Sequence, residues 1–330
     1  MVNRNSMKSI EDIHQMVLKE IEEQNEVLEP KELYEPIWYT LRSGGKRLRP
    51  ILVLLGCQMF SDNLAAALKP ALGIELFHNF TLLHDDIMDK AFLRRNQPTV
   101  HIKWDINRAI LSGDAMAIQA NIFISSCKAD VLPQVLQVFN KTALEVCEGQ
   151  QYDLNFEIRD EVTVAEYMNM IKLKTAVLLA GSLKIGAIIG GSGNEQADLV
   201  YDFGYDMGMA FQLQDDYLDT FGSPETFGKK IGGDIMANKK TFLLIKAKQN
   251  ANPKQLEELN RWYSDEEHDP EKKIPAVQKI FKDLEIDRLT REQVISYSRK
   301  ALDCLENIDT EIERKTELKN FTNKLINRVS

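Results

Sequence analysis

The sequence predicts an all-α protein. Apolar residues recur at spacings of three and four along most of the 330 residues, the period of amphipathic helices, and alternating β-branched runs typical of strands are lacking. Residues 252–330 follow the same pattern with many Glu, Lys and Arg, so we expect a helical outer layer there. Proline and glycine breaks predict about ten or more helices; they fall at residues 29–30, 69–70, 97–98, 132–133, 190–193, 223–224, 252–253 and 269–270.

Composition does not divide the chain. The 44% hydrophobic content extends over the whole length, and no linker rich in Pro, Gly or Ser separates two halves. We therefore expect one domain over residues 1–330, with a flexible tail at about residues 1–8. The net charge of −9 argues against a nucleic-acid partner, because affinity for the phosphate backbone comes from Lys and Arg.

Cysteine usage and apolar stretches predict a cytoplasmic protein. The four cysteines lie far apart, without the close pairs of zinc sites or compact disulfide frameworks. The N-terminus lacks the basic-then-apolar layout of a secretory signal. Residues 176–191 are apolar, but they contain Lys184 and are fewer than the ~20 residues that a span needs. We expect a buried core helix and no transmembrane segment.

The first candidate site is the cluster DDIMD at 85–89. In the helix predicted over about 71–90, one face is apolar and carries Leu72, Leu76, Phe80, Leu83 and Ile87. Another face is polar, because its residues also recur three or four apart; it carries His78, Thr81, Asp85 and Asp89. Taken alone, this cluster is explained by the polar face of an ordinary surface helix, and a functional site is the other interpretation.

A second cluster, DDYLD at 215–219, repeats the arrangement. One face of its helix carries Gly204, Gly208, Phe211 or Gln212, Asp215 and Asp219. Each interior glycine costs a helix about 1 kcal/mol relative to alanine, so we infer that the space is needed, as in an internal cavity. Two such helices facing each other would gather carboxylates at one mouth, which is unfavourable without cations.

Carboxylates without clustered Cys or His select Mg²⁺, which usually shares protein carboxylates with substrate phosphates. The clusters therefore predict a diphosphate substrate. Basic groups that could bind it occur at 44–49 (GGKRLR), at Arg94 and Arg95, at Lys172 and Lys174, and at 229–230 and 239–240. Each group alone reads as a solvated patch. Together with the acids, they supply the donors that phosphate oxygens require.

The ordered motifs resemble those of trans-isoprenyl diphosphate synthases, the farnesyl and geranylgeranyl diphosphate synthase (polyprenyl synthetase) family. The matches run from about Tyr34 onwards and comprise GGKRLRP (44–50), LLHDDIMD (82–89), LRR (93–95), GQQYDL (149–154), KT (174–175), FQLQDDYLD (211–219), and GKKIGGDI with NKKT (228–241). The resemblance implies a helical bundle around a central cavity, Mg²⁺ as cofactor and a homodimer.

The resemblance also implies the site residues. The metal-binding set would be Asp85, Asp89 and Asp215, with Asp86, Asp153, Asp216, Asp219 and the substrate-binding Gln150 nearby. The allylic diphosphate would be held by Arg94, Lys174, Lys230 and Lys239. Isopentenyl diphosphate would be held by Lys46, Arg49, His78 and Arg95. Thr175 and Gln212 would line the reacting carbons and, with Lys174 and Lys230, form the catalytic set.

The implied reaction is a head-to-tail condensation. Metal and basic groups assist ionisation of an allylic diphosphate (dimethylallyl, geranyl or farnesyl), and the double bond of isopentenyl diphosphate attacks the cation. The product would grow towards the N-terminal end of the helix at 71–90, which makes Phe77, Phe80 and Thr81 candidates for control of its length. The aromatic residue five positions before Asp85, with a small residue at four, is similar to the geranylgeranyl type. Farnesyl and longer products are the alternatives.

Other functions fit the motifs less well. A terpene cyclase has no need of the isopentenyl-binding set around Lys46 and Arg49, and a squalene-type synthase should lack GGKRLRP. A non-catalytic partner subunit would not need the complete acids and bases. A purely structural helical protein remains the broad alternative.

Overall fold

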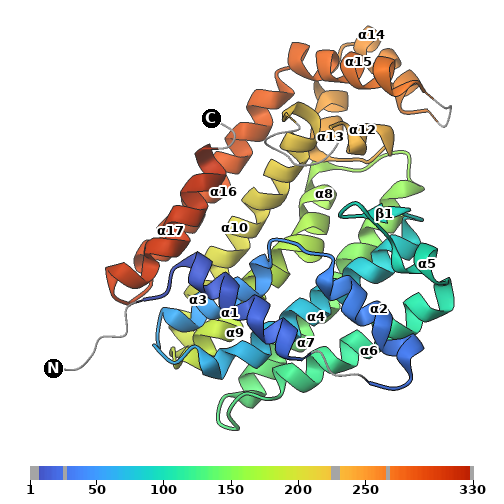
Figure 1. Cartoon of the computed structure of the whole chain (residues 1–330). Coiled ribbons are helices and arrows are strands. Elements are labelled where there is room, and N and C mark those ends of the chain that lie inside the picture. The colour runs from blue at the N-terminus through green and yellow to red at the C-terminus, as the bar shows by residue number, and fades with distance from the viewer. Residues whose placement is uncertain (1–6, 25–27, 224–230, 265–267, 328–330) are drawn as a thin grey trace. The chain divides into compact units, whose positions relative to one another are not determined.

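The computed structural model describes residues 7–24, 28–223, 231–264 and 268–327. Over these residues almost all of the regular secondary structure is helical (Figure 1). The exception is an antiparallel pair of two-residue strands, β1 (Leu93–Arg94) and β2 (Gln97–Pro98). The predicted all-α class is confirmed. Most of the tail expected at residues 1–8 lies outside the described residues.

Two compact units make up the chain, and each is described by itself. Unit 1 comprises Met1–Ala143, Gly181–Tyr201 and Ile308–Leu318; unit 2 comprises Leu144–Ala180, Asp202–Asn307 and Lys319–Ser330. Four helices contribute residues to both units: α7 (Leu132–Glu157), α9 (Val177–Gly190), α10 (Asn194–Phe221) and α17 (Ile312–Asn327). The single domain expected from composition stays a prediction.

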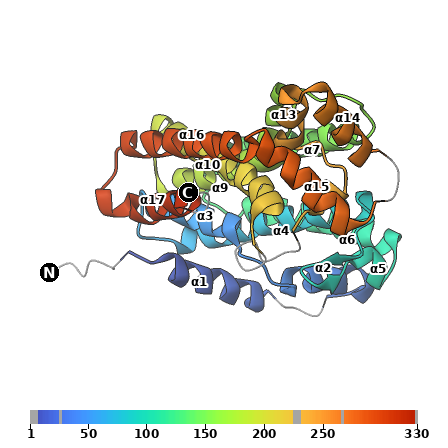
Figure 2. The same cartoon turned by 90° about the horizontal axis from the view of Figure 1, so that it is seen from above.

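Helix α4 forms the core of unit 1. It packs against α1, α2, α3 and α6 (Figures 1 and 2), and its side chains Leu72, Leu76 and Leu83 are buried. The helices found wholly in this unit are α1 (Ile10–Glu23), α2 (Lys31–Arg42), α3 (Leu48–Gln58), α4 (Ala65–Met88), α5 (Val100–Lys103) and α6 (Ile106–Ile124).

One predicted helix start is wrong. We expected a break at Pro70, but α4 begins at Ala65 and continues through this residue. Proline removes a helical hydrogen bond and normally ends or kinks a helix. Here Ala67, Pro70 and Ala71 are all buried, so packing of the first turns offsets the lost bond. Pro253 and Pro270 do begin helices, as predicted, after capping side chains. The break expected at 223–224 extends outside the described residues.

Most of the charged C-terminal region lies in unit 2, and its described residues are helical as predicted. A cluster with Leu243, Val277 and Phe281 joins α12, α13 and α15 (Figure 1). On α16, Val294, Ala301 and Leu305 are buried at helical spacing. The elements found wholly in this unit are α8 (Val164–Ile171), the π-helix η1 (Lys172–Ala176), α12 (Gly233–Met236), α13 (Phe242–Asn250), α14 (Pro253–Trp262), α15 (Pro270–Asp283) and α16 (Ile286–Asn307).

The apolar stretch at 176–191 lies mainly in α9, where Leu178, Leu179 and Leu183 are buried. Among the described residues, the continuous helical segment Val164–Gly190 is long and apolar enough to cross a membrane. However, 72% of its most apolar window is buried inside the protein. This burial agrees with the predicted core helix.

Candidate active site

The first aspartate cluster lies at the C-terminal end of α4. Asp86 is buried, Asp85 is half-buried and Asp89 is exposed. From β1, Arg94 donates from Nε to Asp86 Oδ1 at 2.7 Å and from an Nη to Asp85 Oδ2 at 3.3 Å. Burial raises the pKa of Asp86, although Arg94 opposes the shift. The structure thus brings Arg94 to two of the predicted acids.

A glycine turn precedes α3 and contacts Arg95. Gly44 and Gly45 have φ values of 83° and 121°, a region that glycine adopts readily. The Arg95 guanidinium donates to the Gly44 carbonyl, and a Cβ on Gly45 would lie 2.7 Å from Arg95 Cζ. The turn therefore needs glycine for its backbone conformation, and a side chain at position 45 would also have to displace the Arg95 guanidinium. Lys46, in the same turn, is exposed.

Arg49 and His78, two of the residues predicted to bind isopentenyl diphosphate, lie close together. An Nη of Arg49 is 3.0 Å from His78 Nε2, and because guanidinium nitrogens only donate, Nε2 accepts. The pKa of His78 lies well below its ordinary value because the half-buried ring is partly removed from water and because Arg49 and other arginines lie close to it. His78 is therefore neutral at neutral pH.

Sequence reasoning missed the buried support of this turn. Arg47 donates to Glu75 Oε1 at 2.6 Å, with side chains 3% and 2% exposed, and Asn79 donates to the same oxygen at 2.9 Å. Arg47 also donates to the Leu41 carbonyl. The available signal was a lone acid, Glu75, inside the apolar run ALGIELF.

Two of the chain-length candidates, Phe77 and Phe80, belong to a row of ring side chains on α4. The ring of Phe80 lies 5.6 Å from that of Phe77 and 4.8 Å from that of His84. Phe139 of α7, which sequence reasoning missed, packs edge-on against Phe77 at 5.4 Å. Thr81 is half-buried and donates to the His78 carbonyl at 2.8 Å. Control of product length by these residues stays a prediction.

Unit 2 contains a pocket of about 140 Å³. It brings together six predicted residues: Asp153, Lys174, Thr175, Gln212, Asp216 and Lys239. Tyr167 and Asp234 also line it and were missed. Nothing in the local sequence marks Tyr167, whereas Asp234 belongs to the motif GKKIGGDI and could have been found there. Gln150 is half-buried on α7 and does not line the pocket. Lys230 lies outside the described residues.

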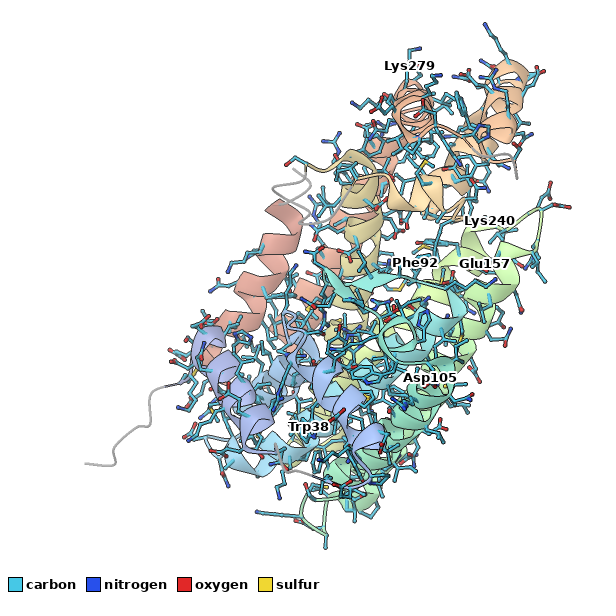
Figure 3. The ribbon with its side chains drawn as sticks, turned by 45° about the vertical axis from the view of Figure 1, so that its right-hand side comes forward. Trp38, Phe92, Asp105, Glu157, Lys240 and Lys279 are labelled. Carbon is cyan, nitrogen blue, oxygen red and sulfur yellow. The ribbon has the colours of Figure 1, made fainter. Side chains whose placement is uncertain are left out.

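Asp153 interacts with two of the lysines that line this pocket. Lys174 Nζ donates to its Oδ2 at 2.6 Å, and Lys239 Nζ lies 3.7 Å from the same oxygen. Burial alone would raise the pKa of Asp153, but the two lysines outweigh it and the pKa is lowered. Lys240 instead donates to the Phe156 carbonyl at 2.6 Å and lies 3.3 Å from that of Glu157, its neighbour in Figure 3.

Lys174 and Thr175 belong to the π-helix η1, a wide turn often found at functional sites. Thr175 Oγ1 donates to Gln212 Oε1 at 2.9 Å, and Gln212 Nε2 donates to Asp216 Oδ1 at 3.0 Å. The other Asp216 oxygen accepts from the Tyr167 hydroxyl. Burial first, and then the charge of Asp234, raise the pKa of Asp216 well above its usual range.

The other acids of the second cluster differ in setting. Asp215 is half-buried. Asp219 is 8% exposed and its Oδ2 accepts the backbone N–H of Asp234 at 2.9 Å, which places it at the start of α12. Asp219 thus contributes to the loop that leads to Lys239, and Asp215 is the most accessible acid of this cluster.

The cavity expected beside the glycines of α10 is wrong at Gly208. A Cβ there would lie 2.7 Å from the Cα of Ala176 in η1. The missing side chain therefore permits a close approach between α10 and η1. The glycine is needed for packing against another helix, a reason that sequence spacing cannot separate from an open cavity.

The donor chemistry fits Mg²⁺. In the part of the chain that the structure describes, no group of three or more Asp, Glu, His or Cys side chains forms a ready metal site. Mg²⁺ is usually bound by one or two carboxylates, waters and substrate phosphates. Asp85 and Asp89 at the end of α4, and Asp215 on α10, supply oxygen donors of this kind within their own units.

Comparison with known proteins identifies the family. The polyprenyl synthetase family model matches residues 30–281. A geranylgeranyl diphosphate synthase of Methanosarcina mazei is 42% identical over 229 residues, 69% of this chain and 71% of the relative. A geranylfarnesyl diphosphate synthase of Natronomonas pharaonis is 37% identical over 258 residues, 73% of this chain and 76% of the relative.

The fold agrees with these matches. A crystal structure of a geranylgeranyl pyrophosphate synthase superposes with a TM-score of 0.93 and 45% identity, covering 98% of this chain and all of that one (100%). The fold therefore matches this group of enzymes over 98% of the chain, and the two sequence relatives match it over 69% and 73%. This chain belongs to the polyprenyl synthetase family, the trans-isoprenyl diphosphate synthases.

Proposed function

We propose that the protein condenses isopentenyl diphosphate with an allylic diphosphate and makes geranylgeranyl diphosphate, with Mg²⁺ as cofactor. The observation that supports this proposal most directly is that, within each unit, predicted acids form ion pairs with predicted basic residues. Arg94 binds Asp85 and Asp86 in unit 1, and Lys174 and Lys239 surround Asp153 in unit 2. Diphosphate oxygens need such cations as partners, and the similarity to geranylgeranyl diphosphate synthases supports the product.

The basic residues have two tasks. Arg94, Lys174, Lys239 and Lys230 would hold the diphosphate that leaves the allylic substrate and stabilise its developing charge. Lys46, Arg49, Arg95 and neutral His78 would bind and orient isopentenyl diphosphate. Bound Mg²⁺ would neutralise diphosphate charge further. Thr175 and Gln212, already joined by a hydrogen bond, would direct oxygen dipoles towards the reacting carbons.

The proposed oligomer is a homodimer formed through α6. This helix exposes large apolar side chains at 41–63% of their surface: Ile106, Ile110, Leu111, Ile118 and Ile122. Monomers rarely expose large contiguous apolar patches, so a second copy of the chain is the proposed cover. Light scattering should give a dimer mass, and Ile118→Glu with Ile122→Glu should give a monomer.

The free thiols of all four cysteines support the proposal that the protein works in a reducing cytoplasm.

The direct test is incubation with Mg²⁺, isopentenyl diphosphate and each of the three allylic primers, followed by chromatographic sizing of the products. A twenty-carbon diphosphate is the expected main product. A hydrocarbon formed without isopentenyl diphosphate would indicate a terpene cyclase instead. A joint shift in melting temperature with Mg²⁺ and a bisphosphonate should accompany activity. The absence of both the product and this shift would overturn the proposal.

A further inference from the structure

We infer that Gly149 and Gly208 are positioning residues for the reaction, because they set the place of η1 and hence of Lys174 and Thr175. With the proposed function as its premise, this role explains why Gly149 stands inside α7 and Gly208 inside α10. Interior glycines weaken helices by about 1 kcal/mol each. Both contacts lie within unit 2.

The contact at Gly149 is with backbone. A Cβ on this residue would overlap the Lys174 nitrogen and would lie 2.7 Å from both the Leu173 carbonyl carbon and the Lys174 Cα. Packed carbon atoms normally lie about 3.5–4.0 Å apart, and a backbone has no alternative rotamer that could relieve the overlap. Any side chain at this position must therefore displace η1 from α7.

The contact at Gly208 is with the end of the same π-turn. Its Cβ would meet Ala176 Cα at 2.7 Å and Ala176 Cβ at 2.9 Å. α10 and η1 can approach this closely because neither residue carries a large side chain here. A side chain at 208 would displace η1 from α10.

Each glycine is followed, four residues later on the same helix face, by a side chain that forms a hydrogen bond with Lys174 or Thr175. After Gly149 comes Asp153, which accepts from Lys174 Nζ at 2.6 Å. After Gly208 comes Gln212, which accepts from Thr175 Oγ1 at 2.9 Å. In each helix, the glycine thus contacts the backbone of η1, and the residue one turn later accepts a hydrogen bond from a side chain of η1. Backbone contact and side-chain bond together fix where Lys174 and Thr175 lie.

The test is a set of double-mutant cycles. Gly149→Ala and Gly208→Ala are each combined with Lys174→Ala, and kcat and KM are measured for both substrates. A displacement near 1 Å can cost about 100-fold, so we expect each glycine variant to lower kcat/KM for the allylic diphosphate by about 10- to 100-fold. KM for isopentenyl diphosphate, whose proposed ligands are in unit 1, should change by less than about 2-fold. With Lys174 absent, each glycine variant should have a much smaller effect, because residues that act together are not additive.

Gly56→Ala is the matched control. Its Cβ would overlap the Leu183 carbonyl oxygen, an equally severe clash with backbone, but in unit 1. Gly56→Ala should lower the melting temperature. Its effect on kcat/KM should be the same whether or not Lys174 is present, so that the fold-changes of the two single variants multiply in the double variant. Gly208→Ala, with the milder overlap, keeps the test available if Gly149→Ala does not fold.

Two results separate the inference from its premise. Wild-type kinetics in folded glycine variants, or effects that multiply with Lys174→Ala as in the control, would overturn the positioning role while leaving the enzyme assignment intact. A wild-type protein that makes no product with any primer would overturn the proposed function itself.

Discussion

Arg47 and Glu75 form an ion pair of 2.6 Å in the interior of unit 1, where their side chains are 3% and 2% exposed. The pair joins the turn that carries Lys46 to the helix that carries the first aspartate cluster. A third side chain, Asn79, donates to the same carboxylate oxygen at 2.9 Å. Losing one partner of such a pair leaves a buried charge without compensation.

Glu75→Gln should therefore lower the free energy of unfolding by about 3–5 kcal/mol and raise KM for isopentenyl diphosphate. The physical reason for the second effect is that Arg47 would no longer hold the turn that carries Lys46. Urea unfolding and steady-state kinetics measure the two effects.

The control for Glu75→Gln is the double variant Arg47→Met with Glu75→Met, because apolar replacement of both partners is often neutral for stability. It should recover most of the lost stability while KM for isopentenyl diphosphate stays raised. A Glu75→Gln protein with wild-type unfolding and wild-type KM would contradict the structural role of the pair.

The environment of His78 predicts a pH dependence of stability. Burial and Arg49 lower the folded-state pKa well below the ordinary value of 6.5. The unfolded chain then binds a proton near pH 6.5 that the folded chain does not, so stability from this residue is complete above that pH and falls as the pH is lowered below it. The expected loss reaches up to about 1.4 kcal/mol per pH unit.

His78→Gln isolates this effect, because it lacks the titrating ring while other groups titrate as before. Urea unfolding at pH 7.5, 6.5 and 5.5 should show the wild type losing more stability than the variant below pH 6.5. Equal losses in the two proteins would show that His78 titrates normally in the fold.

Helical periodicity was sufficient to predict the fold class, because burial of one helix face imposes the spacing of three and four directly. Helix starts at Pro253 and Pro270 were also predictable, since their capping side chains lie next to them in sequence. The start of α4 was not, because packing of distant residues stabilises its passage through Pro70. The π-turn η1 has no local signal of its own.

The site shows the same division. Acids and bases in the motifs were found because their residue types state the chemistry. Tyr167 was missed because its partner, Asp216, lies 49 residues away, and Glu75 because its partner lies 28 residues away. Gly208 was found but misinterpreted, since a glycine that admits a neighbouring helix looks the same in sequence as one that lines a cavity.

Asp215 and Asp216 should differ as metal ligands. Asp216 is 3% exposed and its two oxygens accept hydrogen bonds from Tyr167 and Gln212. Asp215 is half-buried, so a metal ion can reach it more easily. We expect Asp215→Asn to abolish the joint thermal shift with Mg²⁺ and a bisphosphonate. Asp216→Asn should retain that shift while kcat falls by about 10- to 100-fold, as is typical when a group that orients a site is changed.

Tyr167→Phe is the companion variant for Asp216. It removes only the hydroxyl that donates to this carboxylate, so it should reproduce the direction of Asp216→Asn: a retained thermal shift and a lower kcat. Loss of the shift in Asp216→Asn with retention in Asp215→Asn would reverse the two roles.

Phe80→Ala should lengthen the product. The ring lies between those of Phe77 and His84, 5.6 Å and 4.8 Å away, on the helix that carries Asp85. Five residues of helix correspond to about 7.5 Å, so removing the ring opens space at that depth before the first aspartate. Chromatography should show products longer by one or more isoprene units. Phe281→Ala, in a buried cluster of unit 2, is the control: it should cost about 3–5 kcal/mol of stability without changing length. An unchanged product from folded Phe80→Ala would leave Phe77 as the remaining aromatic candidate, because it is the next ring along the row and meets Phe139 at 5.4 Å.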